Sequence, residues 1–170
     1  MRKFFIFMAL NTYLLAMVQN VIAQENQEAS IREDIQLALE IHNDARREVG
    51  VPPLTWSEEL AKDATEYAEE LARIDKLVHA KCGYGENLYW CSWETETPFS
   101  NASNSWYEEI EKYSRVKMSW DNFRGTGHYT QMVWSKTTKV GMGYATTSSG
   151  TTYVVARYDP QGNWIGSYPY

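Results

Sequence analysis

Two histidines and two glutamates have side chains that could together form one functional site. His79 lies seven residues before Glu86. Glu109 and His128 follow later in the chain, His128 directly after Gly125-Thr126-Gly127. Imidazole and carboxylate side chains together suit Zn²⁺ and related divalent ions. Because the chain has no HExxH motif, the spacing leaves both a metal site and four unrelated residues open.

Glu109 keeps the spacing of apolar neighbours. At about 100° per residue, a helix places it on the same side as Trp106 and Tyr113. Its carboxylate is therefore either a partly buried site residue or an edge residue that reaches water. His42 also lies on an apolar stripe, and there we expect a core histidine satisfied by hydrogen bonds, for example to a helix or loop carbonyl.

The composition and the remaining motifs exclude several other chemistries. The chain has 16 Lys and Arg against 22 Asp and Glu, and this acidic balance argues against a nucleic-acid partner. A GxSxG motif is absent, so a nucleophile elbow has no support. The glycines at 83–85 and 125–127 lack the lysine and the spacing of nucleotide-binding loops.

The first 23 residues are typical of a secretory signal peptide. Arg2 and Lys3 precede a short apolar stretch, and Val21-Ile22-Ala23 ends it with a small-residue cleavage pattern. An uncleaved membrane anchor is disfavoured, because a span needs about 20 unbroken apolar residues. We expect no stable membrane span and an extracellular protein, or a periplasmic one in a Gram-negative source.

Export changes the interpretation of the only two cysteines. In an oxidising compartment Cys82 and Cys91 favour a disulfide, the alternative being two free thiols. The sequon Asn101-Ala102-Ser103 is a glycosylation site if the source is a eukaryote.

The periodicity predicts helices first and strands later. Residues 24–34 form a polar lead-in and the start of a first helix, which a capping box at Ser30 and Glu33 opens. A second helix begins near Thr55 or Ser57, and a third begins within 100–105 and carries Glu109. We expect three strands, two of them in a hairpin around the turn 148–150: 87–90, 140–147 and 151–158.

This order of elements predicts an α+β domain with helices on the faces of an antiparallel sheet. With 44% apolar residues, the chain can bury a substantial core. Residues 35–170 contain no repeat or linker, so we expect one domain.

Four stretches resemble the CAP superfamily, which comprises cysteine-rich secretory proteins, antigen 5 and pathogenesis-related class 1 proteins. They follow the family's order and cover nearly all of residues 35–170: HNDAR (42–46), GENLYW (85–90), GHYTQMVW (127–134) and YDPQGNWIG (158–166). The resemblance implies an α-β-α sandwich with a cleft that holds two His and two Glu. Matched by motif, these are His79, Glu86, Glu109 and His128.

The resemblance implies a site that can bind a divalent ion such as Zn or Mg through His79 and His128. Two carboxylates beside two imidazoles can fix the ring tautomers and leave the free nitrogens for the metal. The alternative is a metal-free hydrogen-bonded network, and family members show both states.

The chain departs from its plant-type relatives in its cysteines. Those relatives usually carry Cys at Thr126, Met142 and Ala156, so most of their disulfide framework is missing here. In this respect the chain resembles the cysteine-poor, Golgi-associated branch or bacterial members. We expect the hairpin to depend instead on packing among four residues: Val140, Tyr144, Val154 and Tyr158.

The resemblance favours a secreted, non-enzymatic binding module for a sterol, fatty acid or other small amphipath, or for a protein partner in defence. Aromatic residues around the site segments could line such a site or belong to the core: Trp90, Trp93, Phe99, Trp106, Trp120 and Phe123.

Two other functions are open. A metal-dependent hydrolase or peptidase would use Glu86 or Glu109 as general base, although the family has no generally accepted catalytic activity. A precursor of a C-terminal signalling peptide would release Pro160 to Tyr170, but the CNY that precedes the peptide in relatives is Ala156-Arg157-Tyr158 here.

Overall fold

The computed structural model describes residues 2–93 and 95–170, with side chains from residue 16 onward. Its contacts divide the chain into two units, Met1–Glu33 and Asp34–Tyr170. The described residues of the first unit are helical throughout. Among the described residues, no helix has the length and apolarity that crossing a membrane requires.

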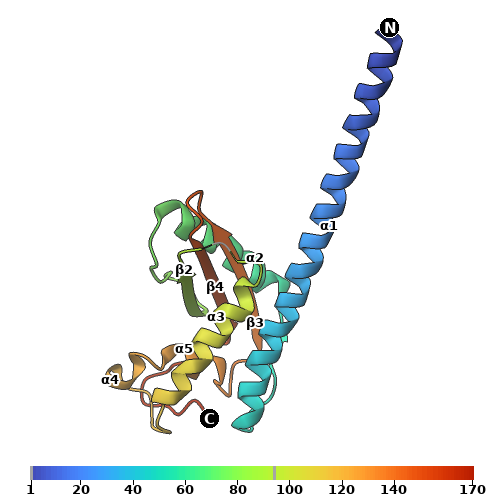
Figure 1. Cartoon of the computed structure of the whole chain (residues 1–170). Helices are drawn as coiled ribbons and strands as arrows, with labels where there is room; N and C mark the ends of the chain where they lie inside the picture. The colour runs from blue at the N-terminus through green and yellow to red at the C-terminus, as the bar shows by residue number, and fades with distance from the viewer. Residues whose placement is uncertain (1, 94) are drawn as a thin grey trace. The chain divides into compact units, whose positions relative to one another are not determined.

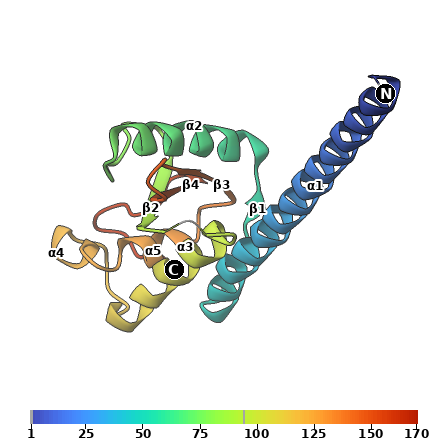
Figure 2. The same ribbon diagram turned by 45° about the horizontal axis from the view of Figure 1, so that its top comes forward.

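The second unit is an α-β-α sandwich, as predicted. Its sheet has the order β1-β3-β4-β2, in which β1 is parallel to β3 and the other pairs are antiparallel. Helix α2 covers one face and α3 and α5 lie on the other (Figures 1 and 2). The elements are α1 (Arg2–Glu48), β1 (Thr55–Trp56), α2 (Glu58–Ile74), β2 (Gly85–Cys91), α3 (Pro98–Tyr107), the 3-10 helix η1 (Glu108–Lys112), α4 (Trp120–Phe123), α5 (Gly127–Met132), β3 (Lys139–Thr146) and β4 (Thr152–Asp159).

Several element predictions need correction. The third helix begins at Pro98 rather than within 100–105, and Glu109 lies after it in the 3-10 helix η1. The first helix does not begin at Ser30, because α1 runs without a break from Arg2 to Glu48 and includes residues 24–29. Strand β1 was not predicted, since two residues are too few to show an alternating pattern. Its parallel pairing with β3 makes the sheet mixed rather than antiparallel.

Helix α2 packs unusually close to the sheet. Its N-cap is Ser57, whose hydroxyl accepts the Leu60 N–H. Its small residues Ala64 and Ala68 meet Val155 of β4 in a core that excludes water. A Cβ added at Gly143 would lie 2.2 Å from the Thr65 backbone nitrogen. Strand β3 can therefore carry no side chain at this crossing.

The β3–β4 hairpin packs in the predicted way. Val140 pairs with Tyr158 and Tyr144 with Val154 across the two strands. All residues of β4 up to Tyr158 are buried, because the strand is interior and both of its faces are covered. Cross-strand pairs of this kind are the unit of sheet stabilisation.

The C-terminal end of α1 is tied to the layer opposite α2 by one buried cation. The Arg46 guanidinium donates to the carbonyl oxygens of Pro52 at 2.6 Å and of Met132, Trp134 and Thr137 at 2.9 Å each. Burial lowers its pKa to about 10. The guanidinium fixes the chain that follows α5 against α1.

His42 lies one turn before Arg46 on the same face and is fully buried. Its Nδ1–H donates to the Ala38 carbonyl at 2.8 Å, and its Nε2 accepts the Tyr158 hydroxyl at 2.7 Å. The expected core histidine with a helix carbonyl as partner is thus confirmed. Burial lowers its pKa from 6.5 to about 4, against the effect of the Ala38 hydrogen bond and with that of the nearby Arg46 charge.

The predicted disulfide between Cys82 and Cys91 is wrong. Both are free thiols, Cys82 exposed and Cys91 buried. Strand β2 separates them, and its seven residues span about 20 Å when extended. A disulfide joins Cα atoms less than about 7 Å apart. Bridging the two thiols would require the edge strand to unfold.

We expect Gly143→Ala to destabilise the protein by about 3 kcal/mol or more, because the new methyl group meets helix backbone that cannot move aside alone. Gly83→Ala is the matched control, since no atom lies within 4 Å of its added Cβ. Urea unfolding of both variants measures the difference. Equal stability of the two would contradict the close packing of α2 on β3.

Acidification should destabilise the protein through His42. The unfolded chain binds this proton near pH 6.5 and the folded chain only near pH 4. The free energy of unfolding therefore falls as the pH drops through that interval, by about 3 kcal/mol for this group. We expect His42→Gln to lack this part of the pH dependence in urea unfolding.

The comparison between parent protein and variant separates titration from packing. Their difference in unfolding free energy at neutral pH measures the hydrogen bonds to Ala38 and Tyr158 that the substitution removes. Only the change of that difference on acidification measures the contribution of His42 protonation to the free energy of unfolding. The carboxylates titrate in both proteins, so their contributions cancel in the difference. Parallel pH profiles would show that His42 does not titrate as its burial requires.

Candidate functional site

Glu109 and His128 form one half of the candidate site. Glu109 lies in η1, and its Oε1 accepts the His128 Nδ1–H at 2.9 Å. Its Oε2 accepts the backbone N–H groups of His128 at 2.8 Å and Tyr129 at 3.1 Å. The carboxylate thus caps the first turn of α5 and orients the ring that the turn carries.

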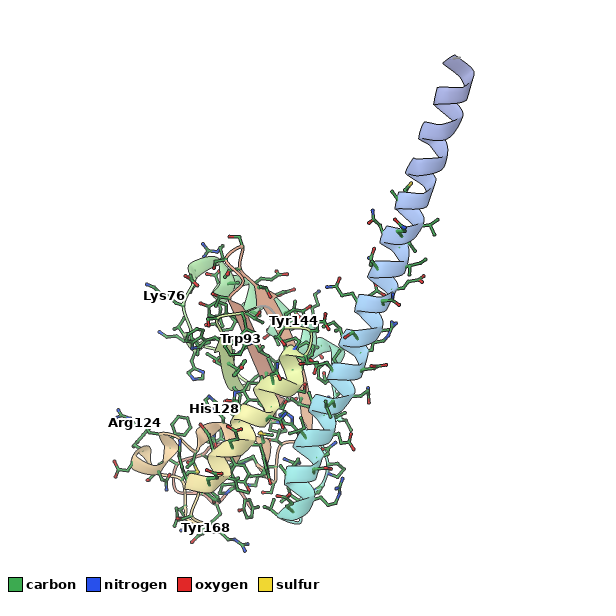
Figure 3. All side chains as sticks on the ribbon, in the orientation of Figure 1. Lys76, Trp93, Arg124, His128, Tyr144 and Tyr168 are labelled. Carbon is green, nitrogen blue, oxygen red and sulfur yellow. The ribbon has the colours of Figure 1, made fainter. Side chains whose placement is uncertain are left out.

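Burial raises the pKa of Glu109, but the hydrogen bond and the charge of His128 and the two backbone N–H groups outweigh it and leave the pKa below its usual value. The carboxylate is therefore held ionised and fully engaged. The His128 side chain is 36% exposed, and it lies near the lower end of β2 in Figure 3.

Two asparagine side chains hold α5 in place. Asn87 of β2 donates to the His128 carbonyl at 3.0 Å and to the Tyr158 hydroxyl at 3.2 Å. Asn163 donates to the Gly127 carbonyl at 2.8 Å and accepts the Thr130 hydroxyl at 2.7 Å. The position of His128 therefore depends on both β2 and the C-terminal segment.

His79 and Glu86 form the other half. The His79 Nδ1–H donates to the Glu86 carboxylate, which also accepts the Ala80 backbone N–H at 3.1 Å. The chain before His79 is fixed by the Tyr67 hydroxyl, which donates to the Val78 carbonyl at 2.6 Å. The His79 side chain is 61% exposed while that of Glu86 is only 6% exposed.

A buried arginine also holds the Glu86 carboxylate in place. The Arg157 guanidinium donates to Glu86 and, at 2.6 Å, to Asp63 of α2. It also lies 4.9 Å from the centre of the Tyr67 ring. Although burial lowers the pKa of Arg157, the hydrogen bond to Asp63 and the charge of Glu86 raise it overall. The two carboxylates thus compensate the buried charge.

Consecutive residues of the GEN motif at 85–87 contact different layers. Glu86 contacts Arg157 and His79, whereas Asn87 contacts His128 and Tyr158. A Cβ at Gly85 would lie 2.2 Å from Gln131 Oε1, so a larger residue there would displace the end of the Gln131 side chain. Since successive side chains of a strand point to opposite faces, one edge strand holds both halves of the site.

The arrangement leaves both imidazoles with the same free atom. Because each Nδ1–H is directed to a carboxylate, each Nε2 keeps its lone pair when the ring is neutral. Carboxylate–imidazole pairs of this type orient metal-binding histidines. Among residues 2–93 and 95–170, however, no three His, Cys, Asp or Glu side chains are placed to hold one ion. An ion at this site would therefore have only the two imidazoles as donors from these side chains, and water or a ligand group would complete its coordination.

The other predicted site residues lie in different surroundings. Asn101 lies on α3, partly buried, and its amide donates to the Thr95 hydroxyl at 2.9 Å. Phe99 and Trp106 are buried in the core, whereas four aromatic side chains are 37–76% exposed: Trp90, Trp93, Trp120 and Phe123.

Three residues on which the site depends were not identified from the sequence. Arg157 occupies a strand position where alternation predicts only a face, and Asp63 is an ordinary acidic residue on a helix. Asn163 lies in a quoted motif, but its positive φ of 59° and its two contacts with α5 are visible only in the fold. An arginine inside an otherwise apolar strand is the one signal that could have indicated a buried charge pair.

Residues 39–158 match the cysteine-rich secretory protein family, CAP. The chain is 40% identical over 132 residues to pathogenesis-related protein 1C of Nicotiana tabacum, covering 78% of each chain. It is also 40% identical over 133 residues to the Golgi-associated plant pathogenesis-related protein 1 of Homo sapiens, covering 75% of this chain and 82% of that protein.

The solved structure of NaASP2 with Zn²⁺ has a TM-score of 0.70 at 28% identity, over 79% of this chain and 83% of that one. BmVAL-1 has a TM-score of 0.61 at 31% identity, over 69% and 64% of the two chains. Sequence and fold therefore agree, and the chain belongs to the CAP family of cysteine-rich secretory and pathogenesis-related proteins.

Proposed function

We propose that this CAP protein is an exported, non-catalytic binding module that takes a divalent ion between His79 and His128. The observation that carries the proposal is the same hydrogen bond at both imidazoles, each of which directs its Nδ1–H to a carboxylate. A bound ion would supply a Lewis-acidic position with sites left for water or an anionic ligand group.

Zn²⁺ fits this donor set better than Mg²⁺, because imidazole nitrogen suits Zn²⁺ and Mg²⁺ prefers oxygen ligands. The similar protein NaASP2 was solved with Zn²⁺, which supports the same choice here. The two carboxylates do not act as ligands in this proposal. Glu86 and Glu109 orient the rings and keep negative charge beside them.

The same hydrogen bonds favour binding over hydrolysis. A general base needs a free lone pair close to the substrate. Glu86 is engaged by His79, Ala80 and Arg157. The pKa of Glu109 is lowered by His128 and by two backbone N–H groups, despite the opposing effect of burial, and this makes the carboxylate a weaker base.

The C-terminal segment is integrated into the domain, which argues against its release as a peptide. Asn163 holds α5, and the Gly162 N–H donates to the Gln131 side chain at 2.9 Å. Further along, the Ser135 N–H donates to the Pro169 carbonyl at 2.7 Å. A sterol or fatty-acid ligand stays a prediction. Trp90 on β2 and Trp93 in the segment after it are half-exposed and offer apolar surface for such a ligand.

We expect one Zn²⁺ to bind per chain, and His79→Ala and His128→Ala each to weaken binding strongly, since each removes a ligand. Glu109→Gln should weaken it by about tenfold, as loss of a carboxylate behind a ligand does. Isothermal titration calorimetry measures these affinities, with circular dichroism to establish folding.

Glu111→Gln is the matched control, because Glu111 lies in the same 3-10 helix but is exposed, whereas Glu109 accepts the hydrogen bonds from His128. It should bind Zn²⁺ as the parent protein does. A folded His128→Ala variant that binds Zn²⁺ with unchanged affinity and stoichiometry would refute the proposed site.

Export should remove residues 1–23 and leave Gln24 as the first residue. Cleavage there leaves the second unit, which begins at Asp34, complete. Mass spectrometry of the protein made in a secreting host with its own N-terminus tests this. A full-length chain retained in the cells would contradict export.

A further inference from the structure

A groove of about 380 Å³ lies at the C-terminal end of the chain, formed by residues that the His/Glu site does not use. Its volume is at the lower end of the range of small-ligand sites. Two short segments line it: Trp134, Ser135 and Lys136 after α5, and Trp164, Ser167 and Tyr168 near the C-terminus.

The groove is held together by backbone hydrogen bonds rather than by loose loops. The Ser135 N–H donates to the Pro169 carbonyl at 2.7 Å and joins its two segments. Met118 pairs with the turn before Tyr168, donating to the Ser167 carbonyl at 2.9 Å and accepting the Gly166 N–H at 2.8 Å. The positive φ of Gly166, 85°, shapes that turn. A site fixed in this way loses little entropy on binding.

Two of the three aromatic residues that line the groove are exposed, and each has a contact within the chain. Trp164 is 55% exposed, but its indole N–H donates to the Gln161 carbonyl at 3.2 Å. Tyr168 is 51% exposed and has the Lys117 ammonium 5.7 Å from its ring centre. Trp134 is buried, and its indole N–H has no partner among the described residues.

The charge of this region is opposite to that of the whole protein. Residues 112–170 carry seven Lys and Arg against two Asp, whereas residues 1–111 carry nine against twenty acidic residues. Lys136 lines the groove and Lys117 stands beside Tyr168. In the described part of the chain, neither lysine forms an ion pair. The groove thus presents unpaired positive charge on an acidic protein.

We propose that this groove binds an acidic oligosaccharide. The half-exposed rings of Trp164 and Tyr168 suit the apolar C–H faces of sugar rings. The hydroxyls of Ser135 and Ser167 can donate to and accept from sugar hydroxyls. The ammonium of Lys136 pairs with a carboxylate or sulfate group of the sugar. These are the aromatic walls and few polar groups that small-ligand sites combine.

The lining favours a sugar over a lipid surface or a nucleic acid. Hydrocarbon in the groove would bury two serine hydroxyls and an ammonium without partners, which is unfavourable. A lipid interface would use the most exposed aromatic residue of this part of the chain, Trp120, which is 76% exposed on α4 and does not line the groove. A nucleic acid would be repelled by the acidic residues of the first two thirds of the chain.

The test uses a short oligogalacturonide, with a neutral cello-oligosaccharide and a sulfated heparin fragment as the other two sugars. We expect saturable binding of the oligogalacturonide, weakened by salt, with amide shifts confined to residues 134–136 and 164–168 in NMR spectra. Binding of the heparin fragment at the same amides would show that the groove accepts sulfate groups as well as the carboxylates of the oligogalacturonide.

Matched variants assign the groove. Trp164→Ala should lower the affinity by about tenfold, whereas Trp120→Ala should leave it unchanged. Lys136→Gln should weaken the acidic sugar but not the neutral one, and Lys139→Gln, an exposed lysine outside the groove, should change neither.

Three results would overturn the proposal. One is the absence of saturable binding of either acidic sugar. Another is binding whose NMR shifts lie at His79 or His128, or whose affinity Trp164→Ala does not change. The third is binding to vesicles of anionic phospholipid that Trp120→Ala abolishes, without binding to the sugars, which would assign a membrane surface instead. The Zn²⁺ affinity of His128→Ala reports on the metal site separately, so either proposal can fail alone.

Discussion

The buried guanidinium of Arg46 is the interaction on which the rest of the domain depends. It has no carboxylate partner in the described part of the chain, and burial lowers its pKa to about 10. Its desolvation is offset by four carbonyl acceptors, one after α1, one at the last residue of α5 and two between α5 and β3. The last three carbonyls belong to Met132, Trp134 and Thr137. The same interaction therefore fixes the helix that carries His128 and the segment that forms the groove.

Edge strand β2 positions both halves of the candidate metal site. Glu86 faces the layer of α2, where Arg157 and Asp63 fix its carboxylate. Asn87 faces the layer of α5, where it holds the His128 carbonyl. A strand at the sheet edge is the one place where consecutive side chains reach both layers and also solvent. The two halves of the site thus share a rigid backbone while each has its own anchor.

Periodicity predicted the elements that are long enough to show a pattern. Helix α2 and the β3–β4 hairpin lie where it placed them, whereas two-residue β1 carries too little pattern. The disulfide prediction was wrong because sequence separation between Cys82 and Cys91 says nothing of the extended strand between them.

The site residues could be predicted only in part, because a local sequence pattern does not show which elements meet in the fold. Glu109 faces His128 although its segment is a 3-10 helix rather than the expected α-helix. In 3-10 geometry residues three apart eclipse one another, so Glu109 follows the direction of Trp106 more closely than it would in an α-helix. Arg157 and Asn163 could not be assigned, because their partners lie on other elements.

Packed side chains occupy the positions at which plant-type relatives are expected to have cysteines. Thr126, Met142 and Ala156 are all buried, and the last two are cross-strand partners. A disulfide acts mainly by restricting the unfolded chain, whereas these side chains act by removing apolar surface from water in the folded one. Such stabilisation requires dense contacts at every layer, which the buried rings of Trp106 and Tyr158 supply. Aromatic residues that remain exposed contribute little of it, and this is the physical reason to seek a binding role for those on the C-terminal segment.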